Sequence, residues 1–313
     1  MILLRCCALV LLGGCHKGDP ATGEAGGSPS TPPPVLWKEF SGDNAFSHTK
    51  AQVDFGPRPA GSQELAKTRD YIVDKLKAAG WEVELQPFTD DTPNGQIAFV
   101  NIIARFPGVP GKPASTSTQQ AIVCSHYDTK FFDTIRFVGA SDGASSTGAL
   151  IELARVLALD PALAQQIELV FFDGEEAVRT WSETDSLYGS RYYARNLRET
   201  GRAKQFKFGV LWDMIGNKDL SITLSPDSPV ELTKGIFSAA DALDMRKHFT
   251  YFRTDIDDDN KPLNLSHIPT IDLIDLDYMP WHTADDTLDK LSPESLQITG
   301  AVTLYYLQQR LAK

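Results

Sequence analysis

The sequence has few cysteines, no excess of positive charge and no hydrophobic run long enough to cross a membrane. Cysteine occurs only four times in 313 residues. No apolar stretch reaches the roughly 20 residues that a transmembrane helix needs. Lysine and arginine number 30 against 41 acidic residues, a formal net charge of −11, and no basic patch typical of nucleic-acid binders is visible. These absences argue against a bundle of transmembrane helices and against nucleic acid as a partner.

The first 15 residues have the pattern of a targeting segment. Arg5 precedes an apolar run that is too short for a membrane helix, and the run ends in Leu12-Gly13-Gly14-Cys15. Small residues before a cysteine resemble the lipobox of bacterial lipoproteins, in which Cys15 would be lipidated and become the new N-terminus. We expect a lipoprotein anchored in the cell envelope on the periplasmic side, with the outer membrane favoured. A plain secretory signal is the alternative.

A tether and one folded domain are expected after Cys15. Residues 16–34 contain nine glycines and prolines in 19 positions and no large apolar side chain, so they cannot bury enough surface to offset their ordering entropy. We expect residues 35–313 to form one catalytic domain. Cys6 and Cys7 would leave with the signal, so Cys124 would be the one cysteine of this domain and could form no disulfide within it.

Hydrophobic periodicity predicts alternating helices and strands in residues 35–313. Apolar residues at helical spacing predict helices over 62–79, 147–159, 186–200, 229–245 and from Ser292 onward. Alternating or continuous apolar runs predict strands over 81–86, 99–106, 121–124, 167–172, 208–212 and 270–276. This alternation favours an α/β fold, a three-layer sandwich around a largely parallel central sheet.

Polar side chains that can bind a metal follow the predicted buried strands. In open α/β sheets, ligands bind at the carboxyl ends of the strands, where these residues would converge. Taken singly, each could be a turn or surface residue. Together they have the pattern of a metal site, because imidazole and carboxylate ligands suit Zn²⁺ and similar cations. The residues after strands are His126 and Asp128, Asp173 with Glu175 and Glu176, Asp213, and His282, and Asp142 lies in a loop that precedes a predicted helix.

The adjacent glutamates Glu175 and Glu176 are of particular interest. Neighbouring side chains in an extended segment point in different directions. One of them can therefore bind a metal while the other faces the substrate as a general acid or base.

Several motifs resemble the clan of zinc-dependent aminopeptidases and glutaminyl cyclases, over essentially the whole of residues 36–313. Within this clan, the chain is most similar to the glutaminyl-peptide cyclotransferases of animals and some bacteria. The clan motifs are Phe55–Ser62, His126–Asp128, Ala140–Asp142, Asp173–Glu176 and Trp281–Thr283. The motifs of the cyclotransferase branch are Phe171–Ala177, Trp181-Ser182, Asp185–Arg191 and Leu211–Gly216.

The resemblance implies a zinc site and a proton-transfer residue. One Zn²⁺ per chain would be held by Asp142, Glu176 and His282. Glu175 would be the general acid/base, with Asp213 beside it in an acidic network.

The resemblance also implies a third acid and two pocket aromatics. The third acid would be Asp259, in the loop before Pro262, with Asp258 as the alternative because Asn260-Lys261 departs from the family's pattern. Trp181 and Trp281 would line the substrate pocket.

The implied activity converts N-terminal glutaminyl residues of peptides to pyroglutamyl residues and releases ammonia. The alternative is a di-zinc aminopeptidase of the same clan, in which His126 and Asp213 are extra ligands and Asp142 bridges the two metals. A lipoprotein that binds peptides without turnover is a third possibility, although a free glutamate beside the metal argues against it. The expected partners are peptides or proteins with N-terminal Gln, and a monomer is favoured.

Overall fold

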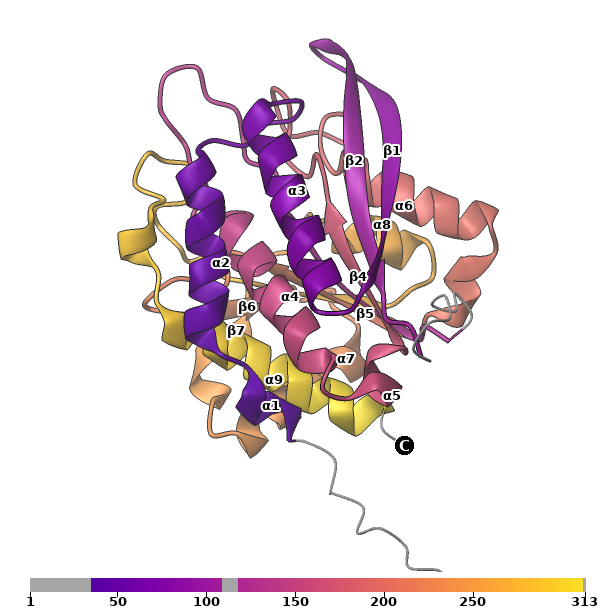
Figure 1. Ribbon diagram of the computed structural model, residues 1–313. Helices are drawn as coiled ribbons and strands as arrows, with labels where there is room; N and C mark the ends of the chain where they lie inside the picture. Colours follow the sequence, from indigo (N-terminus) through magenta and orange to yellow (C-terminus); the bar gives the residue numbers. More distant parts are fainter. Residues whose placement is uncertain (1–34, 109–117, 312–313) are drawn as a thin grey trace, which may run out of the picture. The chain divides into compact units, whose positions relative to one another are not determined.

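The computed structural model describes residues 35–108 and 118–311 of the chain (Figure 1). The predicted signal segment and tether, residues 1–34, lie outside these residues and stay predictions. Within the described residues, no helix combines the length and the apolar character that crossing a membrane requires.

An eight-stranded mixed sheet forms the centre of the domain. Its strands lie in the order β1-β2-β4-β3-β5-β8-β6-β7. The four central strands β4, β3, β5 and β8 run parallel, β1 and β2 form an antiparallel hairpin at one edge, and β6 pairs antiparallel with β8. The strands are β1 (Glu82–Thr92), β2 (Gly95–Arg105), β3 (Ala121–His126), β4 (Ile167–Phe172), β5 (Phe208–Asp213), β6 (Ile222–Leu224), β7 (Phe249–Tyr251) and β8 (Thr270–Ile274).

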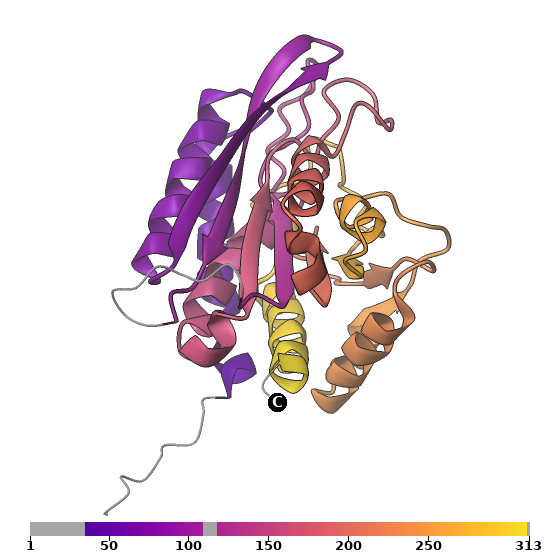
Figure 2. The same cartoon turned by 90° about the vertical axis from the view of Figure 1, so that its right-hand side faces the viewer.

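Helices cover both faces of this sheet, as the edge-on view in Figure 2 shows. One layer contains α1 (Leu36–Glu39), α2 (Gly42–Phe55), α3 (Gln63–Ala78), α4 (Ala144–Leu157), α5 (Pro161–Ala164), α7 (Val230–Ala242) and α9 (Pro293–Leu311). The other layer contains α6 (Tyr188–Glu199) and α8 (Asn260–Leu265). Short 3₁₀ turns are Arg202–Gln205, Arg246–His248 and Leu288–Lys290.

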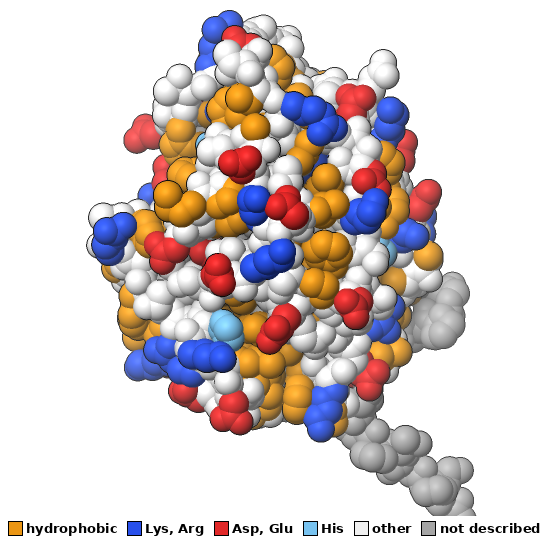
Figure 3. Space-filling view, turned by 90° about the vertical axis from the view of Figure 1, so that its left-hand side faces the viewer, with side chains coloured by type: hydrophobic (Ala, Val, Ile, Leu, Met, Phe, Trp, Pro, Cys, Tyr) orange, Lys and Arg blue, Asp and Glu red, His pale blue; other side chains and the backbone are white. Residues whose placement is uncertain are grey.

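Each face of the sheet has its own hydrophobic core. Leu150 and Leu153 of α4 pack with strand residues on one face, and Tyr193 and Leu197 of α6 pack with Leu263 of α8 on the other. The central strands are buried on both faces, which explains their continuous apolar sequences. On the face drawn in Figure 3, basic and acidic side chains are interspersed with small groups of hydrophobic ones.

The predicted three-layer sandwich with a largely parallel sheet is confirmed. Strand β4 has the predicted bounds, and β5 begins where predicted and ends one residue later. Helices α3 and α6 differ from their predictions by one or two residues at each end. Helix α4 begins three residues earlier than predicted, at Ala144. The sequence pattern missed α2, whose buried side includes Ala45, Thr49 and Gln52 and so lacks an apolar stripe.

Candidate metal centre and active site

The predicted metal ligands and the proton-transfer candidate lie together at the carboxyl ends of the central strands. A pocket of about 240 Å³ opens there. Its walls come from the segments that follow β4, β5 and β8, from the start of α4 and from the loop before α8. The lining includes Asp142, Glu175, Glu176, Trp181, Asp213, Asp258, Trp281 and His282.

Asp142, Glu176 and His282 form a compact group of possible metal ligands. One ligand atom of each residue lies within 4.8 Å of those of the other two. The imidazole Nε2 of His282 is 3.3 Å from Asp142 Oδ2 and 3.2 Å from Glu176 Oε1. Both carboxylates are buried, whereas His282 is partly exposed at the pocket wall. Three side chains that are far apart in the sequence thus face one point.

A hydrogen-bonded carboxylate holds Asp142 in place. The backbone N–H groups of Ser141 and Asp142 donate to the two carboxylate oxygens of Asp286, at 2.7 and 3.1 Å. The Tyr278 hydroxyl donates to the same carboxylate at 2.8 Å. Because Asp286 is fully buried, these bonds fix the loop that presents Asp142 just before α4.

A second carboxylate orients the two glutamates. Asp128 accepts hydrogen bonds from the backbone N–H of Glu175 at 3.1 Å and from that of Glu176 at 3.2 Å. Gly174 has a φ of +72°, and a Cβ there would lie 2.5 Å from the Phe99 ring. The turn after β4 therefore needs glycine, and it places the glutamates at the pocket.

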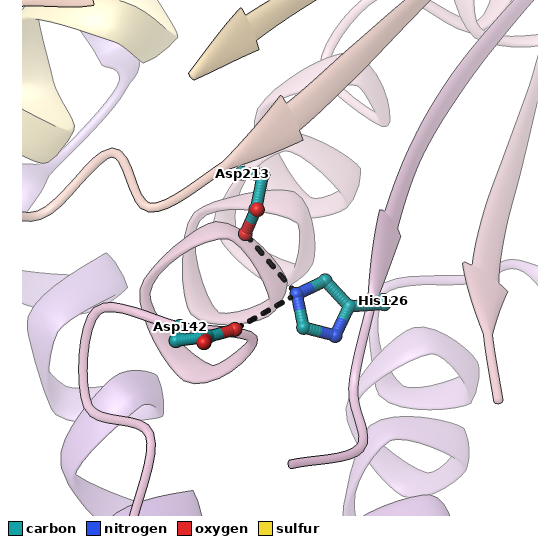
Figure 4. A group of neighbouring side chains, drawn as sticks. All are labelled: His126, Asp142 and Asp213. Carbon is teal, nitrogen blue, oxygen red and sulfur yellow. Dashed lines mark hydrogen bonds and ion pairs between the residues drawn. The ribbon is translucent and has the colours of Figure 1, made fainter. Parts of the chain in front are cut away.

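His126, Asp142 and Asp213 form a second group of possible ligands (Figure 4). The His126 imidazole Nε2 lies 3.1 Å from Asp213 Oδ1 and 3.3 Å from Asp142 Oδ1. All three residues are buried, and Asp142 belongs to both groups. The geometry thus brings together the ligands that a second metal would need.

The first group of possible ligands, Asp142, Glu176 and His282, has donor atoms that suit a zinc ion. Two carboxylates and one imidazole are three ligands of the kind that catalytic zinc sites use, with one coordination position left for substrate. Asp142 Oδ2 and Glu176 Oε2 are buried and accept no hydrogen bond in the described structure. Burial, together with the negative charge of Asp142, raises the pKa of Glu176 to about 7. A cation at this point would compensate the buried negative charges.

Glu175 lies beside this group in an environment that favours its protonated form. Burial raises the pKa of Glu175 well above its usual range, against the opposing effect of His126. The carboxylates of Glu176, Asp258 and Asp259 raise this pKa further. Such an environment suits a general acid/base, which works best with a pKa near the operating pH.

Of the two acids proposed for the loop before α8, Asp258 lines the pocket and Asp259 does not. Asp259 is buried, and its carboxyl interacts with the Ser190 hydroxyl of α6. The two neighbours lie at the start of α8, where successive side chains point about 100° apart. The geometry therefore favours Asp258, the alternative in the sequence interpretation, as the third pocket acid.

The tryptophans Trp181 and Trp281 stand at the mouth of the pocket. They are 38% and 45% exposed, so neither is a core residue. Trp281 stacks on the His282 ring with 4.5 Å between centroids. The Trp181 indole Nε1–H donates to Asp257 Oδ2 at 3.2 Å. Each tryptophan thus combines an exposed aromatic surface with a place in the lining of the pocket.

The sequence pattern gave no role to the buried acids Asp272 and Asp286, and it indicated Asp128 only as a possible metal ligand. Asp128 and Asp286 were not recognised as acceptors for the backbone of Glu175, Glu176 and Asp142. Asp272 on β8 is fully buried and interacts with the Asp258 carboxyl. The available signals in the sequence were an aspartate within an apolar strand, as for Asp272, and a second acid beside a metal-site motif, as for Asp128.

Three comparisons relate the chain to known proteins. The model of peptidase family M28 matches residues 101–307. A glutaminyl-peptide cyclotransferase from Boiga dendrophila is 30% identical over 298 residues, which cover 81% of this chain and 77% of the relative. The structure of a glutaminyl cyclase from an Acidobacteriales bacterium matches with a TM-score of 0.78 and 35% identity over 95% of this chain and 99% of that one. A structure described as a leucine aminopeptidase precursor from Bacteroides thetaiotaomicron matches with a TM-score of 0.75 and 28% identity, over 86% of this chain and 97% of that one.

Proposed function

The chain belongs to peptidase family M28, and from that premise we propose that it is a zinc-dependent glutaminyl-peptide cyclotransferase. The enzyme would convert an N-terminal glutaminyl residue of a peptide to a pyroglutamyl residue and release ammonia. The likeness to cyclotransferases over most of both chains supports this activity. The pocket that joins two exposed tryptophans to Glu175 and the ligand group is the single observation that carries it.

In this proposal Asp142, Glu176 and His282 hold one zinc ion. Bound there, zinc supplies a Lewis acid that polarises the side-chain carbonyl group of the substrate glutamine. The three ligands come from different segments, and the Asp286 and Asp128 hydrogen bonds hold two of these segments rigid. Rigid ligands keep the site ready for substrate without reorganisation.

Glu175 transfers the proton that the reaction must move. In its carboxylate form, Glu175 accepts a proton from the attacking α-amine as the bond from that nitrogen to the side-chain carbonyl carbon forms. It then delivers the proton to the amide nitrogen, which leaves as ammonia when its bond to the same carbon breaks. Asp213 and Asp258 line the same pocket as Glu175, and burial raises the pKa of both of these carboxyl groups.

Trp181 and Trp281 enclose the glutamine side chain between aromatic surfaces. Such packing holds the α-amine close to the carbonyl carbon, and positioning alone supplies a large part of the rate in an intramolecular reaction. The same surfaces exclude water, which would otherwise compete as the nucleophile.

One experiment separates this activity from hydrolysis. Purified protein is incubated with a Gln-initiated and a Leu-initiated peptide, and products are measured by mass spectrometry and an ammonia assay. We expect the Gln-initiated peptide to lose the mass of one ammonia molecule and the Leu-initiated peptide to stay intact. Release of free N-terminal residues from both peptides would identify an aminopeptidase instead.

The aminopeptidase alternative rests on the second group, His126, Asp142 and Asp213, which could hold another zinc ion. One of the similar structures carries an aminopeptidase description. Elemental analysis distinguishes the two proposals, because the cyclotransferase should retain about one zinc per chain after washing and the aminopeptidase two.

We also propose that Cys15 anchors the enzyme to an envelope membrane, a proposal that rests on the sequence motif alone. Cys15→Ala should move the protein from the membrane fraction to the soluble fraction with unchanged activity per molecule. A variant that stays in the membrane fraction would rule out this mode of attachment.

A further inference from the structure

A second concave region lies next to the active-site pocket, between α6 and α8, which lie side by side in Figure 2. Its volume is about 520 Å³. We call it the arginine groove and define it by its lining residues. These are Glu183, Ser186, Leu187, Arg191, Arg195, Arg198, Asp257, Lys261, Pro262 and Leu265.

The arginine groove carries an excess of positive charge on a protein whose formal net charge is −11. Arg191, Arg195 and Arg198 follow one another at four- and three-residue intervals, so they share one face of α6. Lys261 adds a fourth cation from α8. Glu183 and Asp257 are the acids of this lining. Four cations and two acids give the lining of the groove a formal net charge of 4 − 2 = +2.

The three arginines keep their charges available for a ligand. Within residues 35–108 and 118–311, none of them lies in ion-pair distance of a carboxylate. The guanidinium groups of Arg191 and Arg195 lie over the rings of Tyr188 and Tyr192, at 4.9 and 5.1 Å from the ring centroids. Arg198 donates to the Ser266 hydroxyl at 2.5 Å. Arg191 Nη1 also donates to the Glu183 carbonyl oxygen at 2.6 Å. These acceptors are neutral and leave the guanidinium charges uncompensated, and a guanidinium stacked on a ring keeps further N–H groups at its edge for a carboxylate.

Asp257 connects the arginine groove to the active-site pocket. It lines both cavities. Its carboxylate accepts the Trp181 indole N–H on one side, and the Lys261 ammonium group lies 3.2 Å from it on the other. A peptide whose first residue occupies the active-site pocket can therefore continue past Trp181 into the groove.

We propose that the arginine groove binds acidic side chains of the substrate, downstream of its N-terminal glutamine. This inference rests on the proposed cyclotransferase activity and names the preferred class of substrate. The Cα atoms of Arg191 and Arg198 are about 10 Å apart, at 1.5 Å of helix rise per residue. An extended peptide covers this distance with about three residues, at roughly 3.3 Å each. A short acidic tract therefore matches the row of arginines.

The test uses the full, zinc-loaded protein and Gln-initiated peptides of equal length. Each peptide has an alanine background and carries three consecutive glutamates, three consecutive lysines or no charged tract. In a second series, the glutamate tract is moved along the peptide one residue at a time. Ammonia release gives kcat/KM for each peptide. We expect the acidic peptide to exceed the neutral one by about 3- to 10-fold, since each exposed ion pair contributes little, and the lysine peptide to be the poorest.

Matched variants assign this preference to the groove. In the double variant Arg195→Gln/Arg198→Gln, the ratio of kcat/KM for acidic to neutral peptide should fall to about one. Arg310→Gln removes one positive charge from an exposed position on α9, outside the groove, and should keep the wild-type ratio. Circular dichroism spectra check that the variants fold.

The outcomes separate the two proposals. Cyclisation of none of the peptides would overturn the cyclotransferase itself. Cyclisation of all peptides with equal kcat/KM, or a preference for acidic peptides that survives Arg195→Gln/Arg198→Gln, would overturn the role of the groove alone.

Discussion

The active-site pocket and the arginine groove are neighbours of opposite charge and opposite construction. The pocket collects buried acids from the ends of several strands, so its residues are far apart in the sequence. The groove takes three of its four cations from one helix, α6, and Arg195 and Arg198 are exposed. The arrangement of the pocket residues depends on the whole tertiary structure, whereas the row of arginines in the groove depends mainly on helical spacing.

This difference predicts how each region responds to substitution. A buried charge interacts strongly with its neighbours and is hardly screened by salt, whereas an exposed charge is weakened by water and ions. Changes in the pocket should therefore act on catalysis and metal binding by orders of magnitude. Changes in the groove should alter substrate preference by small factors.

The largest effects are expected at the two adjacent glutamates of the pocket. Glu175→Gln should lower kcat by about 10² to 10⁴ and keep zinc, because it removes a proton-transfer group. Glu176→Gln should lose zinc, because it removes a charged ligand. Turnover and zinc content measured on both proteins distinguish these roles. Equal zinc content in the two variants would contradict the division of labour.

A smaller effect is expected at Asp128, which we do not assign as a metal ligand and which accepts hydrogen bonds from the backbone N–H groups of Glu175 and Glu176. Asp128→Asn keeps the shape but can accept only one of the two backbone hydrogen bonds with its oxygen. Turnover should fall about 10- to 100-fold, as for other residues that orient metal ligands. Asp133→Asn, an exposed change in the following loop, is the control and should match wild type. Full activity of Asp128→Asn would show that the orientation of the glutamates does not depend on this carboxylate.

Trp281→Ala should have an intermediate effect because it removes one aromatic wall of the pocket. We expect a loss of about 3- to 10-fold in kcat/KM for Gln-initiated peptides, since an aromatic contact contributes roughly 0.5–1.5 kcal/mol beyond its buried area. The unfolding midpoint should change little, because the side chain is 45% exposed. A large fall in the unfolding midpoint would instead show that Trp281 supports the fold.

The smallest effect is expected from salt. Raising the ionic strength shortens the Debye length from about 10 Å at 0.1 M to about 3 Å at 1 M. The preference for acidic over neutral peptides should therefore shrink toward one across this range, while kcat for the neutral peptide changes much less. A preference that is insensitive to salt would indicate that the groove recognises shape rather than charge.

Much of the architecture could be predicted from hydrophobic periodicity. The central strands are continuous apolar runs because both of their faces are covered, and such runs are easily recognised. Helix α2 could not be recognised in this way, because small and polar residues such as Ala45 and Gln52 form its buried side. Gln52 donates to the Ala144 carbonyl oxygen across the helix interface, a contact that no local pattern encodes.

The sequence by itself predicted the kind of chemistry and most of the residues that we propose for it. The Glu175-Glu176 pair and the polar ends of apolar strands indicated a metal site before any contact was known. Only the tertiary structure showed that Asp258 lines the pocket and Asp259 does not. It also revealed the hydrogen bonds that Asp128 and Asp286 accept, and it placed the arginines of α6 beside the pocket. The physical reason is that residue type and spacing encode local conformation, whereas the direction of a loop side chain and the neighbours of a helix face depend on packing of distant segments.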